Sequence, residues 1–217
     1  MQITLSDLAF KYKKSLPPVL DGVTYSFQSG KLYTLLGANG SGKTTLGKLI
    51  LGLLKPTRGE ITIDGQSGKK LSAGKRANRI GYLFQNPDMQ LFATSVLEEL
   101  TFPFEITKCL TEQKKKELSD LLVKFKLGGM EDRFPLTMSG GEKQRLALAT
   151  VMSRDVKFLI LDEPTSAIDQ DGRAFITDFI NGFVGAGGGA IVITHDEDLL
   201  TELKNPVTLK LFGGKLT

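Results

Sequence analysis

A glycine-rich stretch at residues 37–45 carries the residues best suited to chemistry. It reads Gly-Ala-Asn-Gly-Ser-Gly-Lys-Thr-Thr and fits the pattern G-x-x-x-x-G-K-[ST] of a phosphate-binding P-loop. Its glycines let the backbone curl around an anion without Cβ clashes, so that several N–H groups can reach phosphate oxygens. Lys43 is expected to reach the β- and γ-phosphates of a nucleotide, and the Thr44 hydroxyl to ligate Mg²⁺. The expected nucleotide-binding residues of this stretch are Asn39, Gly40, Ser41, Gly42, Lys43, Thr44 and Thr45.

The segments on either side of this stretch fit a P-loop. The apolar run at residues 32–36 predicts a buried strand, and leucines and isoleucine at helical spacing follow Thr45. A helix that begins near Lys43 adds the positive end of its dipole to the phosphate site. The order of strand, loop and helix therefore favours a P-loop over a glycine-rich turn that merely precedes a helix.

Two adjacent carboxylates follow a second apolar run, at residues 156–161. In a parallel sheet these residues, Asp162 and Glu163, lie at the carboxyl edge, where ligand sites of α/β proteins are found. Asp162 suits Mg²⁺ through water. Glu163 points in another direction and is a candidate to polarise an attacking water molecule.

A third stretch combines a helix start with two glycines. Ser139 and Glu142 have the spacing of a capping box, which alone would explain both residues. Gly140 and Gly141 are not needed for capping, and each disfavours a helix by about 1 kcal/mol. Their presence indicates that something must approach the backbone closely.

Three further candidates are single residues. His195, the only histidine, directly follows the buried strand predicted at residues 190–194, a better position for contact with a γ-phosphate than for a structural role. Tyr12 could stack on an adenine base, although such an aromatic residue more often packs at a strand edge. Gln85 follows the strand predicted at residues 79–84.

Composition sets bounds on the class of protein. The chain has 217 residues, enough for one large domain or a domain with a sizeable insert, and no apolar run is long enough to cross a bilayer. A net charge of +4 permits an anionic ligand but does not argue for nucleic acid as a partner. No secretory signal opens the chain, and a single cysteine, Cys109, fits a reducing cytosol.

Periodicity predicts an α/β fold. Alternating residues at 2–11 and 19–28 predict an antiparallel N-terminal β region. The polar, basic residues 66–78 are expected to form a solvated loop. From about 95 to 135 helical patterns interrupt the strands, with a capping box at Ser95 and an amphipathic helix at 111–126, which predicts an inserted helical subdomain. Further strands and a helix are expected at 60–65, 207–212 and 170–184.

Taken together, these motifs resemble the ATPase subunit of an ATP-binding cassette (ABC) transporter. The P-loop, Gln85, Ser139-Gly140-Gly141-Glu142, Asp162-Glu163, Asp169 and His195 occur in the order of that family. The resemblance implies ATP and Mg²⁺ as cofactors. It implies roles in catalysis for Glu163, His195 and Gln85, in metal binding for Thr44, Gln85 and Asp162, and in nucleotide binding for Tyr12, Ser139, Gly140, Gly141, Glu142 and Asp169 as well as for the P-loop.

The resemblance also implies an architecture and partners. The whole chain, 1–217, would form a single ABC ATPase domain of the P-loop NTPase fold, with a core at 1–85 and 136–217, a mostly parallel core sheet and a helical subdomain at about 86–135. Two ATPase subunits, identical or different, would form a head-to-tail dimer with two ATP molecules at the interface. A separate transmembrane transporter subunit would hold them at the cytoplasmic face of the cell membrane as peripheral proteins.

The octapeptide at residues 85–92 narrows the resemblance. It is similar to the corresponding loop of energy-coupling-factor and cobalt/nickel-type importers, which move vitamins or transition-metal ions. Leu91 and Phe92 are expected to be exposed and to receive a helix of the membrane subunit.

Two departures from the family pattern stand out. Met138 and Glu142 replace the commoner leucine and glutamine, but the phosphate-facing Ser-Gly-Gly is intact and no loss of activity is expected. The chain also ends soon after its last strands, whereas many energy-coupling-factor ATPases carry a further C-terminal segment that helps dimerisation. We therefore expect the dimer to be weaker when no nucleotide is bound. The alternatives are an ABC protein of DNA repair or translation and a small-molecule P-loop kinase. ABC proteins of DNA repair or translation usually have two cassettes in one chain or long coiled-coil inserts, and neither is present in this sequence. A small-molecule kinase would leave Ser139–Glu142 and His195 without a role.

Overall fold

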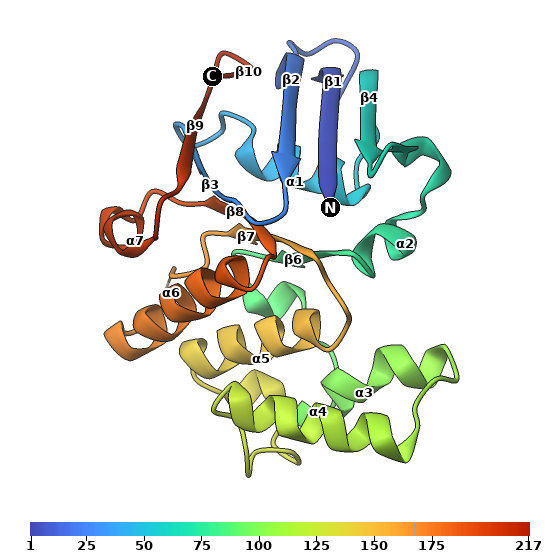
Figure 1. Cartoon of the computed structure of the whole chain (residues 1–217), viewed down its shortest axis with the longest axis vertical. Helices are drawn as coiled ribbons and strands as arrows, with labels where there is room; N and C mark the ends of the chain where they lie inside the picture. Colours follow the sequence, from blue (N-terminus) through green and yellow to red (C-terminus); the bar gives the residue numbers. More distant parts are fainter. Residues whose placement is uncertain (167) are drawn as a thin grey trace.

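The computed structural model describes residues 1–166 and 168–217 and is built around a six-stranded sheet with the order β10-β9-β3-β8-β7-β6 (Figure 1). β3, β6, β7, β8 and β9 run parallel, and only β10 is antiparallel to its neighbour. Every residue of β7 and β8 is buried, which explains why both segments are apolar in sequence up to Asp162 at the end of β7. The strands are β3 (Leu32–Leu36), β6 (Ile80–Leu83), β7 (Phe158–Asp162), β8 (Gly189–Ile193), β9 (Val207–Phe212) and β10 (Lys215–Leu216).

A second, antiparallel sheet has the order β2-β1-β4-β5 and confirms the predicted N-terminal β region. Its strands are β1 (Gln2–Phe10), β2 (Leu20–Gln28), β4 (Arg58–Ile63) and β5 (Gln66–Ser67). Helix α1 (Lys43–Leu51), which follows the glycine-rich stretch, packs between the two sheets. Its Leu46 and Leu49 share one apolar cluster with Leu5 of β1 and Ile160 of β7. The predicted order of strand, loop and helix is therefore correct.

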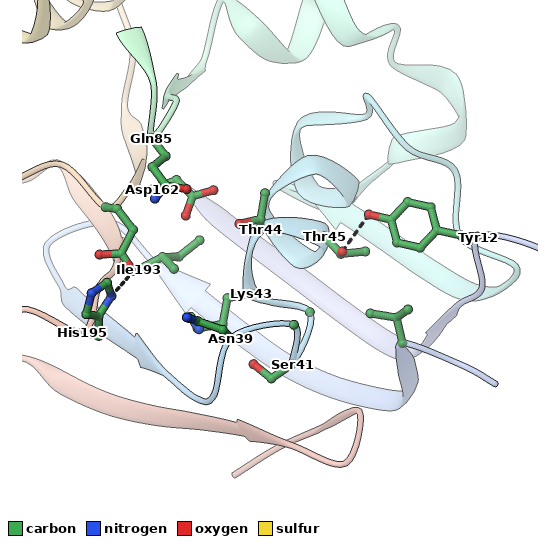
Figure 2. Close-up of a pocket in the computed structure, with 14 residues that line it drawn as sticks. Tyr12, Asn39, Ser41, Lys43, Thr44, Thr45, Gln85, Asp162, Ile193 and His195 are labelled. Carbon is green, nitrogen blue, oxygen red and sulfur yellow. Dashed lines mark hydrogen bonds and ion pairs between the residues drawn. The ribbon is translucent and has the colours of Figure 1, made fainter. Parts of the chain in front are cut away.

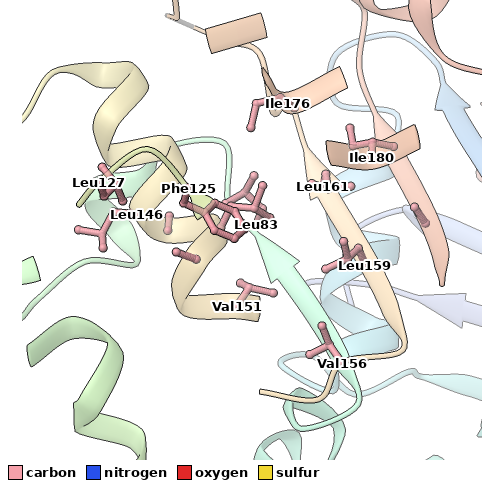
Figure 3. Close-up of a cluster of buried hydrophobic side chains, with 14 of the residues drawn as sticks. Leu83, Phe125, Leu127, Leu146, Val151, Val156, Leu159, Leu161, Ile176 and Ile180 are labelled. Carbon is pink, nitrogen blue, oxygen red and sulfur yellow. The ribbon is translucent and has the colours of Figure 1, made fainter. Parts of the chain in front are cut away.

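A group of helices lies on the opposite side of the six-stranded sheet (Figure 1). They are α3 (Val96–Ile106), α4 (Glu112–Lys124), α5 (Gly140–Met152), α6 (Gln170–Gly185) and α7 (Glu197–Glu202). Figure 3 shows Leu159 and Leu161 of β7 near Val151 of α5 and Ile176 of α6, in a second buried cluster. α3 and α4 pack on α5 rather than on a strand. The stretch predicted to interrupt the strands is thus helical, and α5 lies between it and the sheet.

The stretch at residues 66–78, predicted to be a solvated loop, is mostly exposed but is not a loop. This stretch contains β5, a 3₁₀ turn at Gly68–Lys70 and helix α2 (Ala73–Ala77), and Arg76 within it is only 8% exposed. The Arg76 guanidinium donates to the carbonyls of Leu49 and Ile50, at 3.1 and 2.8 Å. These carbonyls belong to the last turn of α1, where carbonyls commonly need partners from outside the helix, although the Leu49 carbonyl also accepts from Gly52 N at 3.1 Å. Arg76 is therefore buried because it satisfies the end of the helix that follows the glycine-rich stretch.

The capping boxes differ between the two predicted sites. At α5 the box is complete, since Ser139 accepts from Glu142 N and the Glu142 carboxylate accepts from Ser139 N. At α3 Ser95 caps the helix, but the Glu98 carboxylate accepts from the N–H of Thr94 instead. Two more 3₁₀ turns lie at Pro87–Met89 and Pro135–Thr137. No helix among residues 1–166 and 168–217 has the length and apolar character needed to span a membrane.

Candidate active site

A cavity of about 470 Å³ opens at the carboxyl edge of the parallel strands (Figure 2). Most of the candidate residues lie around it, although they come from distant parts of the sequence. Its lining consists of Tyr12, Val19, Asn39, Gly40, Ser41, Gly42, Lys43, Thr44, Thr45, Gln85, Asp162, Glu163, Ile193 and His195. The fold brings these residues together because β3, β6, β7 and β8 all end at this edge.

Glycine is required at the start of the glycine-rich loop. A Cβ on Gly37 would lie 2.5 Å from the Leu211 carbonyl oxygen and 2.8 Å from Ser41 Oγ, so any side chain would collide with its surroundings. The loop folds around the largely buried Lys43, whose Nζ donates to the carbonyl oxygens of Gly37 at 2.7 Å and Ala38 at 3.2 Å. The ammonium group is thereby held within the loop, at the first residue of α1.

The groups around the loop fit a phosphate chain and Mg²⁺. Ser41 Oγ is buried and has no hydrogen-bond partner among the described residues, so a hydrogen-bonding group of a ligand would satisfy it. The N-terminus of α1 presents free N–H groups and a positive dipole end. Thr44, Gln85 and Asp162 offer the hard oxygen ligands that Mg²⁺ prefers. Mg²⁺ usually combines one or two such protein ligands with phosphate oxygens and is seldom bound by protein groups alone.

Asp162 is oriented by a buried tyrosine. The Tyr82 hydroxyl donates to Asp162 Oδ2 at 2.9 Å, and both side chains are buried. Burial raises the pKa of Tyr82, and the charge of Asp162 raises it further, so the phenol remains a donor. Nothing local in the sequence singles out Tyr82. Only the pairing of β6 with β7, which aligns Tyr82 with Ile160, brings it next to Asp162.

Glu163 has an unusual backbone conformation. Its φ of 49° lies in the left-handed region, and its N–H donates to the Ile193 carbonyl at 2.8 Å. This conformation turns the side chain away from Asp162. Glu163 Oε1 lies 2.7 Å from His195 Nδ1, and Oε2 accepts from Thr194 Oγ1 at 3.2 Å. Such strain in a buried non-glycine residue is typical of functional sites.

Tyr12 and Gln85 lie at opposite sides of the cavity (Figure 2). The Tyr12 hydroxyl is hydrogen-bonded to Thr45 Oγ1 at 2.9 Å, and its exposed ring meets Phe10 edge-on at 4.9 Å. Its ring is available for stacking on a base. Gln85 is exposed, and its backbone carbonyl accepts from Ser166 Oγ at 3.4 Å.

The remaining candidates form a separate group. Ser139, Gly140, Gly141, Glu142 and Asp169 do not line the cavity. Asp169 caps α6, and a Cβ built on Gly141 would lie 4.0 Å from its Oδ1, so the two segments are neighbours. Ser139, Gly140 and Asp169 are exposed. Within one chain, therefore, these five residues do not belong to the cavity around the P-loop.

The contacts of several residues that shape the site cannot be inferred from the sequence. Val19 and Ile193 line the cavity as apolar residues, and Thr194 is a partner of Glu163. Buried Gln144 of α5 donates through Nε2 to the carbonyl of Pro164 at 3.1 Å. It thereby links the helix that begins at Gly140 to the loop that carries Glu163. Only spatial proximity, not sequence spacing, reveals these roles.

The expected exposure of Leu91 and Phe92 is correct for one of the two residues. Phe92 is 62% exposed, but Leu91 is only 5% exposed and belongs to the cluster beneath the helices. The two adjacent side chains therefore lie in different environments, one in the core and one at the surface. A substitution at Leu91 would therefore disturb the core.

Comparison with known proteins agrees with the architecture. A family model described as ABC transporter matches residues 20–166. The energy-coupling factor transporter ATP-binding protein EcfA1 of Thermotoga maritima is 38% identical over 203 residues, which cover 94% of this chain and 76% of the relative. CbiO1 of Clostridium perfringens, described as part of the ABC transporter complex CbiONQ, has a solved structure that is 30% identical. It matches with a TM-score of 0.84 over 99% of this chain and 86% of that one. A dimeric bacterial ABC transporter cassette, 25% identical, gives a TM-score of 0.85 over 99% and 96%.

Proposed function

The chain belongs to the ABC transporter family as an ATP-binding and ATP-hydrolysing subunit of a transporter, and from this premise we propose that it powers an importer of the energy-coupling-factor type. The cargo would be a vitamin or a transition-metal ion. The import proposal rests on the similarity to EcfA1 over nearly the whole chain. The octapeptide at residues 85–92, which is similar to the corresponding loop of such importers, supports it further.

We propose specific roles for the residues around the cavity. Lys43 and the N–H groups of the glycine-rich loop bind phosphate oxygens, and Tyr12 stacks on the adenine base. Thr44, Gln85 and Asp162 hold Mg²⁺, which when bound offsets the negative charge of the phosphates. What supports these roles is the oxygen-rich donor set and the orphaned hydroxyl of Ser41.

Hydrolysis depends on Glu163 and His195 in this proposal. The Glu163 carboxylate orients and polarises the attacking water, and His195 contacts the γ-phosphate. Both side chains line the cavity, and Glu163 Oε1 lies 2.7 Å from His195 Nδ1. Because Glu163 is largely buried while His195 is mostly exposed, the histidine is the more accessible of the two to a bound ligand.

We further propose that two subunits complete each site. Ser139, Gly140, Gly141, Glu142 and Asp169 lie outside the cavity of their own chain, and three of them are exposed. In a head-to-tail dimer these residues would close on the nucleotide held by the other subunit. The fold is similar to that of a cassette known as a dimer. The second subunit is either another copy or a related ATPase.

A membrane subunit would dock where the loop after β6 meets α3. A groove of about 360 Å³ there is lined by Gln90, Phe92, Glu99, Phe102, Pro103, Ile106, Thr150 and Arg154. Phe92 and Ile106 are exposed apolar residues. Glu99 Oε1 and Arg154 Nε are buried without a partner among the described residues, and burial raises the pKa of Glu99.

These features suit a helix with an apolar face and at least one polar side chain. We propose that such a helix of a transmembrane subunit holds this protein at the cytoplasmic face of the membrane. Residues 86–135 would then move as a subdomain when the dimer opens and would transmit this motion to the helix of the membrane subunit.

Reconstitution tests the proposed function. This ATPase, together with energy-coupling-factor membrane subunits from its source organism, should drive ATP-dependent uptake of one compound from a panel of labelled vitamins, Co²⁺ and Ni²⁺ into proteoliposomes. The Glu163→Gln complex is the matched control and should show no uptake. A stable association with export-type membrane domains, or no uptake from the entire panel, would contradict the import proposal.

A further inference from the structure

Asp196, the residue after His195, joins four segments near the site. Its Oδ2 accepts from Thr165 Oγ1 at 2.8 Å, and its Oδ1 accepts from Leu199 N at 3.2 Å and so caps α7. Its backbone N–H donates to Thr194 Oγ1 at 3.0 Å. The Arg173 guanidinium of α6 lies 3.6 Å from Oδ2. None of the roles described above uses this carboxylate.

These contacts connect the two loops that carry Glu163 and His195. Thr165 lies on the loop after β7, two residues beyond Glu163, whereas Asp196 lies on the loop after β8. Thr194, which accepts from Asp196 N, also donates to Glu163 Oε2. The loops are therefore joined at Glu163 and, independently, at Asp196.

The charge of Asp196 strengthens its contacts. Burial raises its pKa, but the hydrogen bond from Thr165 and the charge of Arg173 lower it, and the net result lies below the ordinary value. The carboxylate therefore accepts as an anion, and charge-assisted hydrogen bonds are stronger than neutral ones. Arg173 lies one turn after Asp169, whose side chain caps the same helix. The contact thus reaches from the start of α6 to the His195 loop.

We propose that Asp196 is a positioning residue for hydrolysis. By bonding the loop after β7 to the loop after β8 and to α6, it fixes the positions of Glu163 and His195 relative to each other. The proposal rests on the proposed roles of Glu163 and His195. A small displacement of reacting groups can reduce a rate by about 10²-fold. Loss of these contacts should therefore slow turnover more than it weakens nucleotide binding, because the hydrogen bonds and the ion pair of Asp196 among the described residues involve no residue of the glycine-rich loop.

Asp196→Ser is the most informative variant. Serine retains a helix cap for α7 but is too short to bond to Thr165 or Arg173. We expect kcat for ATP hydrolysis to fall about 10-fold or more, with KM and the melting temperature nearly unchanged. Thr165→Val, which removes the partner, should behave similarly, and the double variant should be no worse than Asp196→Ser. Asp198→Asn is the matched control, since Asp198 pairs with Arg173 from an exposed position on α7 and should leave turnover unchanged.

The outcomes separate this inference from the proposed function. If the wild-type protein hydrolyses ATP and Asp196→Ser retains kcat within about twofold of Asp198→Asn, Asp196 has no positioning role. A fall in melting temperature that accounts for the lost turnover, or a rise in KM with kcat intact, would also overturn the inference. If the wild-type protein itself does not hydrolyse ATP, the proposed roles of Glu163 and His195 fail instead.

Discussion

Glu163 Oε1 lies 2.7 Å from His195 Nδ1, although 32 residues separate the two in the sequence. The contact depends on the left-handed backbone at Glu163, which turns this side chain away from Asp162 and toward the end of β8. Asp162 is held by Tyr82 instead and lines the same cavity as Thr44 and Gln85. The two adjacent carboxylates therefore face different partners, as their proposed division between metal and water requires.

Glu163→Gln tests the role of this carboxylate. The amide keeps the shape of the side chain and a hydrogen bond to His195, but it cannot act as a base. We expect ATP binding to persist and turnover to fall by about 10²-fold or more. Phosphate release and equilibrium binding of labelled ATP·Mg²⁺ measure the two quantities separately. Near-normal turnover in the variant would show that another group serves as the base.

Lys43→Ala tests the phosphate site. The ammonium group is the main positive charge inside the glycine-rich loop, and its removal leaves the carbonyls of Gly37 and Ala38 facing an incoming anion. We expect ATP affinity to fall at least 10-fold while the melting temperature without nucleotide changes little. Calorimetric titration with ATP·Mg²⁺ provides the comparison. Unchanged affinity would mean that nucleotide does not bind at this loop.

Phe92→Asp tests the docking groove. Phe92 is an exposed apolar residue at the rim, so a charge there should abolish co-purification with the membrane subunit and leave ATP binding intact. Phe212→Asp is the matched control, because Phe212 is 85% exposed on β9, on the opposite side of the molecule from α3 (Figure 1). Equal recovery of the membrane subunit with both variants would exclude this groove as the docking site.

Arg76→Met tests the contribution of the buried guanidinium to stability. The substitution removes donors from the last carbonyls of α1 and leaves them buried, which we expect to cost about 3 kcal/mol in the free energy of unfolding. Arg79→Met is the control, since Arg79 pairs with Asp64 at the surface and should cost less than about 1 kcal/mol. Urea denaturation measures both. Similar values for the two variants would contradict the cap at the end of α1.

Much of this structure follows from local sequence patterns. The glycine-rich loop, the buried strands and the carboxylates at the end of β7 are each encoded within a few residues, and the structure agrees with those predictions. Arg76 shows where such patterns fail. Its stretch is polar, and its burial follows from hydrogen bonds to the carbonyls at the end of α1, more than 20 residues earlier.

The site depends in the same way on long-range geometry. Tyr82 reaches Asp162 only through strand pairing, and Asp196 reaches Thr165 only because β7 and β8 are neighbours. Leu91 and Phe92 are adjacent and both apolar, yet the first is buried in the core and the second is exposed. Spacing can indicate which residue types are present for chemistry, whereas the partners that orient them come from the fold.

The dependence of dimerisation on ATP tests the composite site most directly. Glu163→Gln should bind ATP without turning it over, and its apparent mass should double when ATP·Mg²⁺ is added. Adding Gly141→Asp places a bulky, negatively charged side chain where the γ-phosphate of the ATP bound by the other subunit would lie. Repulsion between the two negative charges should oppose closure of the dimer. ATP should still bind the untouched loop of each separate subunit. Light scattering with and without ATP, on this chain alone and with a candidate second ATPase subunit, decides the matter. The composite site predicts that the double variant stays monomeric, and dimerisation equal to that of Glu163→Gln would contradict it.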